Sequence, residues 1–207
     1  LLLRTEDMAV LEWIAAQAGP RCVVAIDAPL FIPNRTGTRA CDRSVASRYA
    51  ARKIGVYPCN RRLFERLQRS RLIRRRPETE FGFSEATTDI EGTLTYFETY
   101  PHPAIVNLLE LDERIAYKKG RVRQRRERLS LLARLLRERL PRLDPPVAPT
   151  ASPDAVLEPG WIRLRGRGLK AAEDAIGALV CAYAGARWIA AGLRASEVYG
   201  RPGEGMM

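Results

Sequence analysis

The sequence has too few histidines and cysteines to predict a structural zinc site or a disulfide framework. It contains one histidine, His102, and four cysteines, none of them paired in a C-x-x-C motif. Structural zinc needs four cysteine, histidine or carboxylate ligands at workable spacings. Proteins that depend on disulfides carry cysteines at a much higher density. We therefore expect an ordinary hydrophobic core to hold the fold.

Long hydrophobic runs and two common targeting or nucleotide motifs are also missing. Charges or glycines interrupt every apolar stretch, before it reaches the roughly 18 residues that span a membrane. The N-terminal segment LLLRTED turns acidic too early for a signal peptide. No G-x-x-x-x-G-K-[ST] loop is present to cradle nucleotide phosphates. These absences predict a soluble, cytoplasmic protein with no membrane partner, and they count against a P-loop enzyme.

The chain does contain enough apolar sequence for a core, together with a large excess of positive charge. Apolar residues make up 46% of its 207 residues, which suits a single domain over 1–207. The 35 basic residues outnumber the 24 acidic ones and give a formal net charge of +11. Such a charge favours polyanionic partners, of which nucleic acid is the commonest.

Predicted helices and strands alternate along the chain, which is typical of an α/β fold. Residues 22–30 (CVVAIDAPL) predict a buried strand of a parallel sheet, and residues 93–100 (TLTYFETY) predict a second strand. The remaining predictions are helices over 6–18, 40–54, 60–76, 103–111, 121–140 and 170–191, a proline-rich loop at about 142–160 and a short strand over 196–199.

Three acidic residues are candidate catalytic groups and metal ligands. Asp27 follows the apolar run of the first strand, and open α/β sheets bind ligands at the carboxyl ends of their strands. Its other possible role is to cap a turn. Glu98 lies among aromatic residues, where a buried carboxylate needs a partner or a metal. Its other possible place is a solvated face, paired with an arginine. Asp174 lies near the start of the last helix, where the helix dipole also favours an acid.

Small residues predict that the last helix packs closely on the sheet. The face of Asp174 continues through Ala178, Cys181 and Gly185, so a short aspartate there could meet Asp27 at the end of the strand. Magnesium binds a few carboxylates and keeps several water molecules. Two such ions about 4 Å apart activate water in phosphodiester hydrolysis. The acids therefore predict a site for Mg²⁺ or Mn²⁺.

Six segments occur along the chain in an order that is more specific than any one of them. They are VAIDAPLFIP, RACDR, VYPCNR, FETYPHPAI, YKKGR and EDAIGALVCAYAGARW. This combination resembles a family of predicted RNase H-like nucleases, catalogued as domain of unknown function 429, from about residue 1 to the end. The resemblance implies an RNase H-like domain, with a mixed central sheet flanked by helices, and a metal-dependent nuclease.

The resemblance also implies roles for individual residues. Asp27 resembles the acid of the fourth strand, Asp174 the acid of the last helix, and Glu98 the glutamate of an E-x-Y-P motif. Two further motifs, R-x-C-D-R and a lysine pair, match Arg39, Asp42, Arg43, Lys118 and Lys119.

The sequence departs from the family pattern at two points. The first strand, whose acid anchors the metal pair in RNase H-like enzymes, is absent from this sequence. A strand upstream of Leu1 would complete the site, and without one we would not expect catalysis. Many family members also carry an aspartate three residues after the helix acid, where this chain has Gly177. Glu173 could replace that aspartate only if the helix were rotated, because neighbouring helix positions point about 100° apart.

The basic residues fit a nucleic-acid substrate, although a run of charges is also typical of a solvated face. Arginine binds phosphate with two parallel hydrogen bonds. The candidates for phosphate binding are Arg39, Arg43, Lys118, Lys119, Arg121 and Arg125. The candidates for supporting roles are Asp42, Glu173 and His102, the last as a general acid or as a structural residue.

We therefore predict a nuclease that hydrolyses RNA or DNA with carboxylate-bound Mg²⁺ or Mn²⁺. Two alternatives stay open. A non-catalytic nucleic-acid-binding protein on the same fold would be favoured by acids too far apart to share an ion. An enzyme for a small phosphorylated or nucleotide substrate would be favoured by a narrow, closed pocket.

Overall fold

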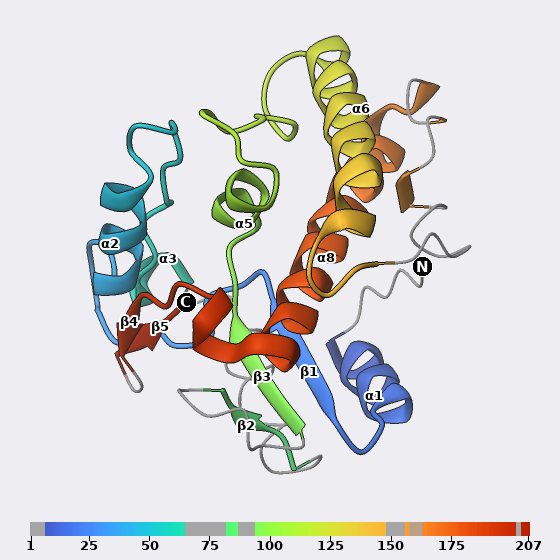
Figure 1. Cartoon of the computed structure of the whole chain (residues 1–207). Helices are drawn as coiled ribbons and strands as arrows, with labels where there is room; N and C mark the ends of the chain where they lie inside the picture. The colour runs from blue at the N-terminus through green and yellow to red at the C-terminus, as the bar shows by residue number, and fades with distance from the viewer. Residues whose placement is uncertain are drawn as a thin grey trace.

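A parallel sheet of three strands, flanked by helices, lies in the lower half of the molecule as Figure 1 shows it. Strand β3 (Leu94–Glu98) lies between β1 (Cys22–Ile26) and β2 (Ser84–Glu85), and both pairings are parallel. The predicted α/β class is confirmed, but the sheet is not mixed among the strands described. The structure is a computed structural model that describes residues 7–64, 82–86, 94–147, 156–157, 160, 163–201 and 204–207.

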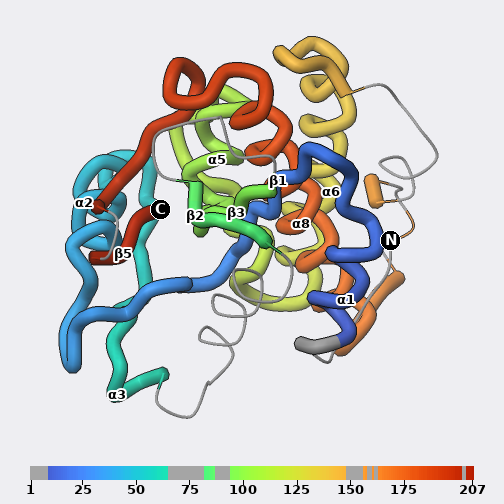
Figure 2. Tube along the Cα trace, turned by 90° about the horizontal axis from the view of Figure 1, so that it is seen from below, coloured from blue at the N-terminus to red at the C-terminus, as the bar shows by residue number. Residues whose placement is uncertain are grey.

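Helices cover the sheet and extend well beyond it. In Figure 1, α5, α6 and α8 lie above the sheet, whereas α2 and the β4–β5 hairpin lie beyond α5 at the left. Seen from below in Figure 2, α1 and α2 lie on opposite sides of the sheet. The helices are α1 (Asp7–Gln17), α2 (Ala40–Arg48), α3 (Arg61–Phe64), α5 (Pro101–Leu108), α6 (Val122–Arg139) and α8 (Gly166–Ala191). Short 3₁₀ helices follow α6 (η1, Leu140–Arg142) and α8 (η3, Gly192–Ala195).

The largest part of the core lies between α5, α6 and α8. The predicted leucine face of α6 is buried there, with Leu129, Leu132 and Leu136 each exposed by 1% or less. It packs against apolar residues of α8, including Leu169 and Ile176. The 3.6-residue period of α6 therefore identified its buried face correctly.

Two helices begin or end at other residues than predicted, one because of a proline and one because the chain turns. Helix α5 begins at Pro101 rather than at 103, since proline is favoured in a first helical turn. Helix α2 ends at Arg48 rather than at 54, because the chain turns there and reaches φ 58° at Lys53. The part of the predicted helix 60–76 beyond Phe64 lies outside the described residues.

The predicted strand over 196–199 is wrong, and a hairpin follows it instead. Strands β4 (Gly200–Arg201) and β5 (Gly205–Met206) pair antiparallel. Gly200 and Gly205 have φ values of 96° and 93°, which L side chains rarely adopt. A Cβ on Gly200 would also lie 2.1 Å from the carbonyl oxygen of Gly205. The hairpin therefore requires glycine, which is a poor strand former by composition.

Helix α8 corrects the prediction that no segment is long and apolar enough to cross a membrane. Together with η3 it spans 30 residues, Gly166–Ala195, and an 18-residue window within them has a mean hydropathy of 1.5, which suffices by length and composition. Its many alanines and β-branched residues outweigh a few charges. In the structure this helix packs against β1, α5 and α6, so its apolar surface contributes to the core.

Helix α8 packs closely on β1 at Gly185. A Cβ on this glycine would lie 3.5 Å from Val23 Cγ1 and 3.7 Å from the Val23 carbonyl oxygen, which is ordinary contact. We expect Gly185→Ala to change the free energy of unfolding by less than about 1 kcal/mol, since alanine also favours the helix. Gly185→Leu should cost about 1–3 kcal/mol through overpacking. Urea unfolding of both variants tests this, and equal stabilities would contradict the close packing.

Candidate functional site

Two carboxylates face a common region at the carboxyl end of β1. Asp27 directly follows Ile26, the last residue of this strand. Asp174 lies in the third turn of α8, because the helix begins at Gly166, eight residues earlier. The dipole at the start of a helix acts mainly within its first turn, so it does not account for an acid at this position.

The pKa of Asp27 shows which charges surround it. Although the side chain reaches solvent, partial burial raises its pKa, and the negative charge of Asp174 raises it further. The ammonium groups of Lys118 and Lys170 act in the opposite direction. Asp27 and Asp174 are therefore close enough to interact, as the sequence predicts, and two lysines share their surroundings.

Both lysines form ion pairs with Asp174. The Nζ atom of Lys170, one helical turn earlier, lies 2.5 Å from Asp174 Oδ1, and the Nζ atom of Lys118 lies 3.4 Å from the same oxygen. The side chain of Asp174 is 44% exposed and that of Lys170 is 60% exposed. Exposed ion pairs contribute about 0–1 kcal/mol, so these contacts leave the carboxylate available to a stronger ligand.

Lys118 comes from a segment between α5 and α6 that an arginine of α6 holds in place. Arg128 Nη1 donates hydrogen bonds to the carbonyl oxygens of Ala116 and Lys119, at 3.4 and 3.0 Å. Gly120 then takes a φ of 100°, where a Cβ would lie 2.7 Å from Gln124 Oε1. These contacts fix the direction in which the lysine pair leaves the segment.

His102 packs between two tyrosine rings beside the site. Its ring centroid lies 5.6 Å from that of Tyr100 and 5.5 Å from that of Tyr117. Burial lowers the pKa of His102 to about 4, and the cations Arg114 and Lys118, with Lys119, act in the same direction. The imidazole is therefore neutral near pH 7, which does not suit the predicted role of general acid at that pH.

Glu98, the third predicted metal ligand, belongs instead to a buried network of ion pairs with Arg39. Arg39 donates to both of its carboxylate oxygens, at 2.8 and 2.5 Å, and the backbone N–H of Leu30 donates to Oε2 at 2.9 Å. Arg39 also binds both oxygens of Asp42, at 2.9 and 2.7 Å. All three side chains are at least 95% buried.

This ion-pair network corrects two of the predicted roles. Glu98 is engaged by Arg39 and does not join Asp27 and Asp174. Arg39 is buried by its contacts with the two acids and is not placed to bind a nucleic acid, and Asp42, predicted as a supporting residue, holds Arg39. Among the described residues, no three histidine, cysteine or carboxylate side chains lie together in a group that could hold a metal ion. The alternative in which Glu98 pairs with an arginine is therefore the observed one, in the interior rather than in solvent.

The arginines of α6 mainly hold neighbouring elements. Arg125 binds both carboxylate oxygens of Glu173, at 2.7 and 2.8 Å, and Arg126 donates to the carbonyl oxygen of Leu164 just before α8. Glu173 is 99% buried, so it cannot replace an acid at position 177, and Arg125 is not free for phosphate. Arg121 is exposed at the start of α6.

Two other predicted phosphate-binding residues lie near the surface with protein partners. Exposed Arg43 donates to the carbonyl oxygen of Thr38, and Lys119 Nζ lies 5.9 Å from the ring centroid of Tyr57. The arginine cluster at 74–76 lies outside the described residues.

Over residues 3–203 the chain matches the family described as "Protein of unknown function (DUF429)". It belongs to this family. No curated protein and no solved structure matches it. The resemblance stated from the ordered motifs is thus confirmed across nearly the whole chain.

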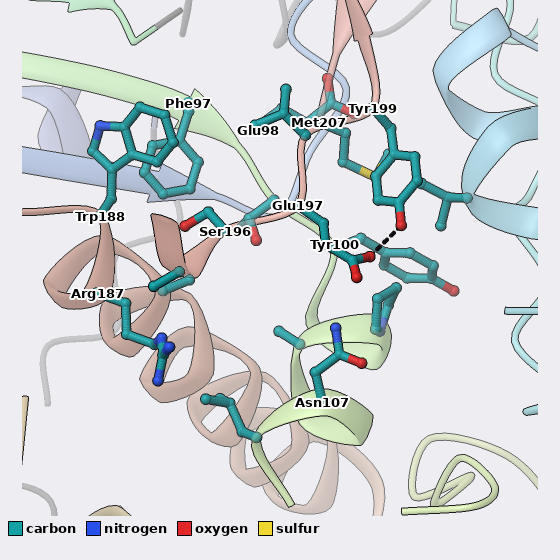
Figure 3. A pocket seen from close by; sticks show the side chains of 18 of the residues that line it. Phe97, Glu98, Tyr100, Asn107, Arg187, Trp188, Ser196, Glu197, Tyr199 and Met207 are labelled. Carbon is teal, nitrogen blue, oxygen red and sulfur yellow. Dashed lines mark hydrogen bonds between the residues drawn. The ribbon is translucent and has the colours of Figure 1, made fainter. Parts of the chain in front are cut away.

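This DUF429 protein also has a cavity of about 400 Å³ between α5, α8 and the C-terminal segment. Figure 3 shows Phe97, Arg187 and Trp188 at one side of it, and Tyr199 with Glu197 at the other. Glu197 accepts hydrogen bonds from the hydroxyls of Tyr199 and Tyr49. The walls of the cavity include neither Asp27 nor Asp174. The cavity is therefore separate from the acidic site, by which we mean Asp27 and Asp174 with the side chains next to them.

Two residues of the acidic site were missed in the sequence, and Gly177 was noted only as a departure from the family pattern. Lys170 lies four residues before Asp174, a spacing that predicts an ion pair on a helix. Tyr117 directly precedes the lysine pair in the YKKGR segment, and the sequence analysis predicted no role for it. Gly177 lies next to Lys118 and Tyr117 in space, although 58 residues separate it from the nearer of them in the sequence. Only the packing of α8 shows this neighbourhood.

The buried Arg39 network should contribute strongly to the stability of the fold. Arg39→Met leaves the carboxylates of Asp42 and Glu98 buried without their cation, which should cost about 3–5 kcal/mol in the free energy of unfolding. Arg43→Met, an exposed neighbour in the same motif, is the matched control and should change it by less than about 0.5 kcal/mol. Chemical denaturation measures both. A tolerated Arg39→Met would show that the network is not structural.

The lowered pKa of His102 should make the stability of the protein depend on pH. Its pKa is about 4 in the folded chain and about 6.5 when unfolded, so only the unfolded chain takes up this proton between those values. Stability should therefore fall as the pH drops from 6.5 to 4, by up to about 3 kcal/mol from this group. His102→Gln should lose less stability over the same range in urea unfolding. Equal losses would mean that His102 titrates alike in both states.

Proposed function

We propose that the protein is a metal-dependent nuclease with an RNase H-like fold, acting on RNA or DNA. The observation that carries this proposal is the electrostatic interaction of Asp27 with Asp174 at the carboxyl end of β1. These acids come from the two elements that the family resemblance names, a strand that follows a helix and the last helix. The parallel sheet with helices around it is compatible with the proposed fold.

The two carboxylates fit a hydrated divalent cation. Magnesium in proteins is bound by one or two carboxylates together with water and substrate phosphates, and Asp27 and Asp174 supply that number. Both reach solvent, which leaves room for water and substrate oxygens. When bound, Mg²⁺ or Mn²⁺ would lower the pKa of a water molecule and polarise a phosphoryl oxygen.

The lysines of the site would bind the substrate. Lys118 and Lys170 hold Asp174 in the absence of other partners, and a divalent ion on that carboxylate would release them to contact phosphate oxygens. His102, neutral near pH 7, would position the Tyr117 ring rather than transfer a proton. The net charge of +11 supports a polyanionic substrate and a steep dependence of binding on salt.

A non-catalytic nucleic-acid-binding protein is the second candidate. It is favoured by the pairing of Asp174 with two lysines and by the absence of a third ligand beside the acids in the part of the chain that the structure describes. In that case the lysines neutralise the acids and the site binds phosphate without hydrolysing it.

Cleavage assays with site variants test the proposal. We would incubate the protein with labelled single- and double-stranded RNA, DNA and hybrids, with Mg²⁺, Mn²⁺ or EDTA. Asp27→Asn and Asp174→Asn should each lower the cleavage rate by about 100-fold or more, since even neighbours of metal ligands are worth about 10- to 100-fold. Glu113→Gln, which changes an exposed carboxylate paired with Lys53, should cleave normally.

The outcomes separate the two candidates. Metal-dependent cleavage that both aspartate substitutions abolish would support the nuclease. Salt-sensitive binding without cleavage, unaffected by either substitution, would contradict it and support the binding protein.

A further inference from the structure

The hydroxyl of Tyr117 is buried beside the acidic site without a hydrogen-bond partner. The whole residue is 0% exposed. A buried hydroxyl that makes no hydrogen bond costs about 1–3 kcal/mol, and native structures contain few of them. Because phenylalanine would fill the same space at no such cost, the hydroxyl calls for a ligand that the folded chain does not itself supply.

A glycine leaves room beside this hydroxyl. Gly177 lies within α8, one turn after Asp174, and glycine inside a helix costs about 1 kcal/mol relative to alanine. A Cβ at this position would lie 3.5 Å from Lys118 Nζ and 3.7 Å from the Tyr117 hydroxyl oxygen. The hydroxyl, the ammonium group and Gly177 thus lie close together, with space for about one methyl group at Gly177.

The hydrogen-bonding groups of this space suit a ligand that accepts hydrogen bonds, although charges of both signs surround it. The groups that adjoin it are donors: a phenol O–H and the N–H groups of Lys118. Arg114 and Lys119, with Lys118, also lie near enough to lower the pKa of the neighbouring His102. Burial raises the pKa of Tyr117, and the negative charges of Asp27, Asp174 and Glu173, with Cys181, raise it further. Glu173 is neutralised by Arg125.

We propose that Tyr117 and Lys118 form a phosphate-binding subsite next to Asp27 and Asp174, with Gly177 leaving room for one phosphate oxygen. The hydroxyl and the ammonium group each donate a hydrogen bond to the phosphate. Lys118 makes this contact by turning its flexible side chain away from Asp174, where its ion pair is weak. Phosphate is named as the ligand because the proposed nuclease would bind phosphodiesters, so this subsite rests on the proposed function.

The contact between Tyr117 and phosphate is tested without metal. Binding of inorganic phosphate would be followed by ³¹P NMR titration in EDTA, beside thermal unfolding of the same proteins. Tyr117→Phe should weaken phosphate binding about tenfold or more, as expected for a lost hydrogen bond to a charged group. Its Tm should be equal to or above that of the parent protein, because no internal hydrogen bond is lost.

Two further variants make the result specific. Gly177→Ala fills the space and should weaken phosphate binding while the helix keeps or gains stability. Tyr183→Phe is the matched control, since its hydroxyl donates to the Pro145 carbonyl oxygen at 3.0 Å. That variant should bind phosphate normally and unfold at a lower Tm.

The outcomes are independent of the nuclease proposal. Unchanged phosphate affinity in Tyr117→Phe, or a lowered Tm, would overturn the subsite and assign a buried water to the hydroxyl. A parent protein that binds no phosphate in EDTA would also overturn it. Loss of phosphate binding with retained stability would support the subsite even if no nucleic acid is cleaved.

Discussion

The guanidinium of Arg39 joins the parts of the chain that surround the end of the sheet. Its five N–H groups donate to both oxygens of Asp42, both oxygens of Glu98 and the carbonyl oxygen of Phe31. This satisfies every donor that an arginine has. The contacts connect the segment after β1, the first turn of α2 and the end of β3, and the C-terminal hairpin packs against them through Gly205.

Because this network fixes where β1 and β3 end, it also fixes where Asp27 emerges. The other half of the acidic site depends on α6, whose arginines bind the segment before α8, Glu173 on α8 and the segment that carries Lys118. Buried charges in this protein therefore position elements, whereas the side chains of Asp27, Asp174 and Lys118 reach solvent. Side chains of the same type thus differ in role according to how deeply they are buried.

Local patterns in the sequence predicted the elements better than the partners of individual side chains. The apolar run of β1 and the leucine period of α6 depend on neighbours in the sequence. The buried face of α6 was confirmed, and so was a strand at the apolar run, although it ends at Ile26 and is only half-buried. The small residues of α8 led us to expect Asp174 near Asp27, and its charge does act on that carboxyl group. Glu98 was misassigned because its partner, Arg39, lies 59 residues away. Sequence spacing does not show such a contact, and a buried ion pair and a metal site use the same residue types.

The central claim is that Asp27 and Asp174 together hold a divalent cation while Glu98 serves the buried network. The most direct measurement is the anomalous diffraction of crystals soaked in Mn²⁺. The account predicts an ion between the carboxylates of Asp27 and Asp174, with Lys118 moved away from Asp174. An ion bound by Glu98, or no ion at the two aspartates at saturating Mn²⁺, would contradict it.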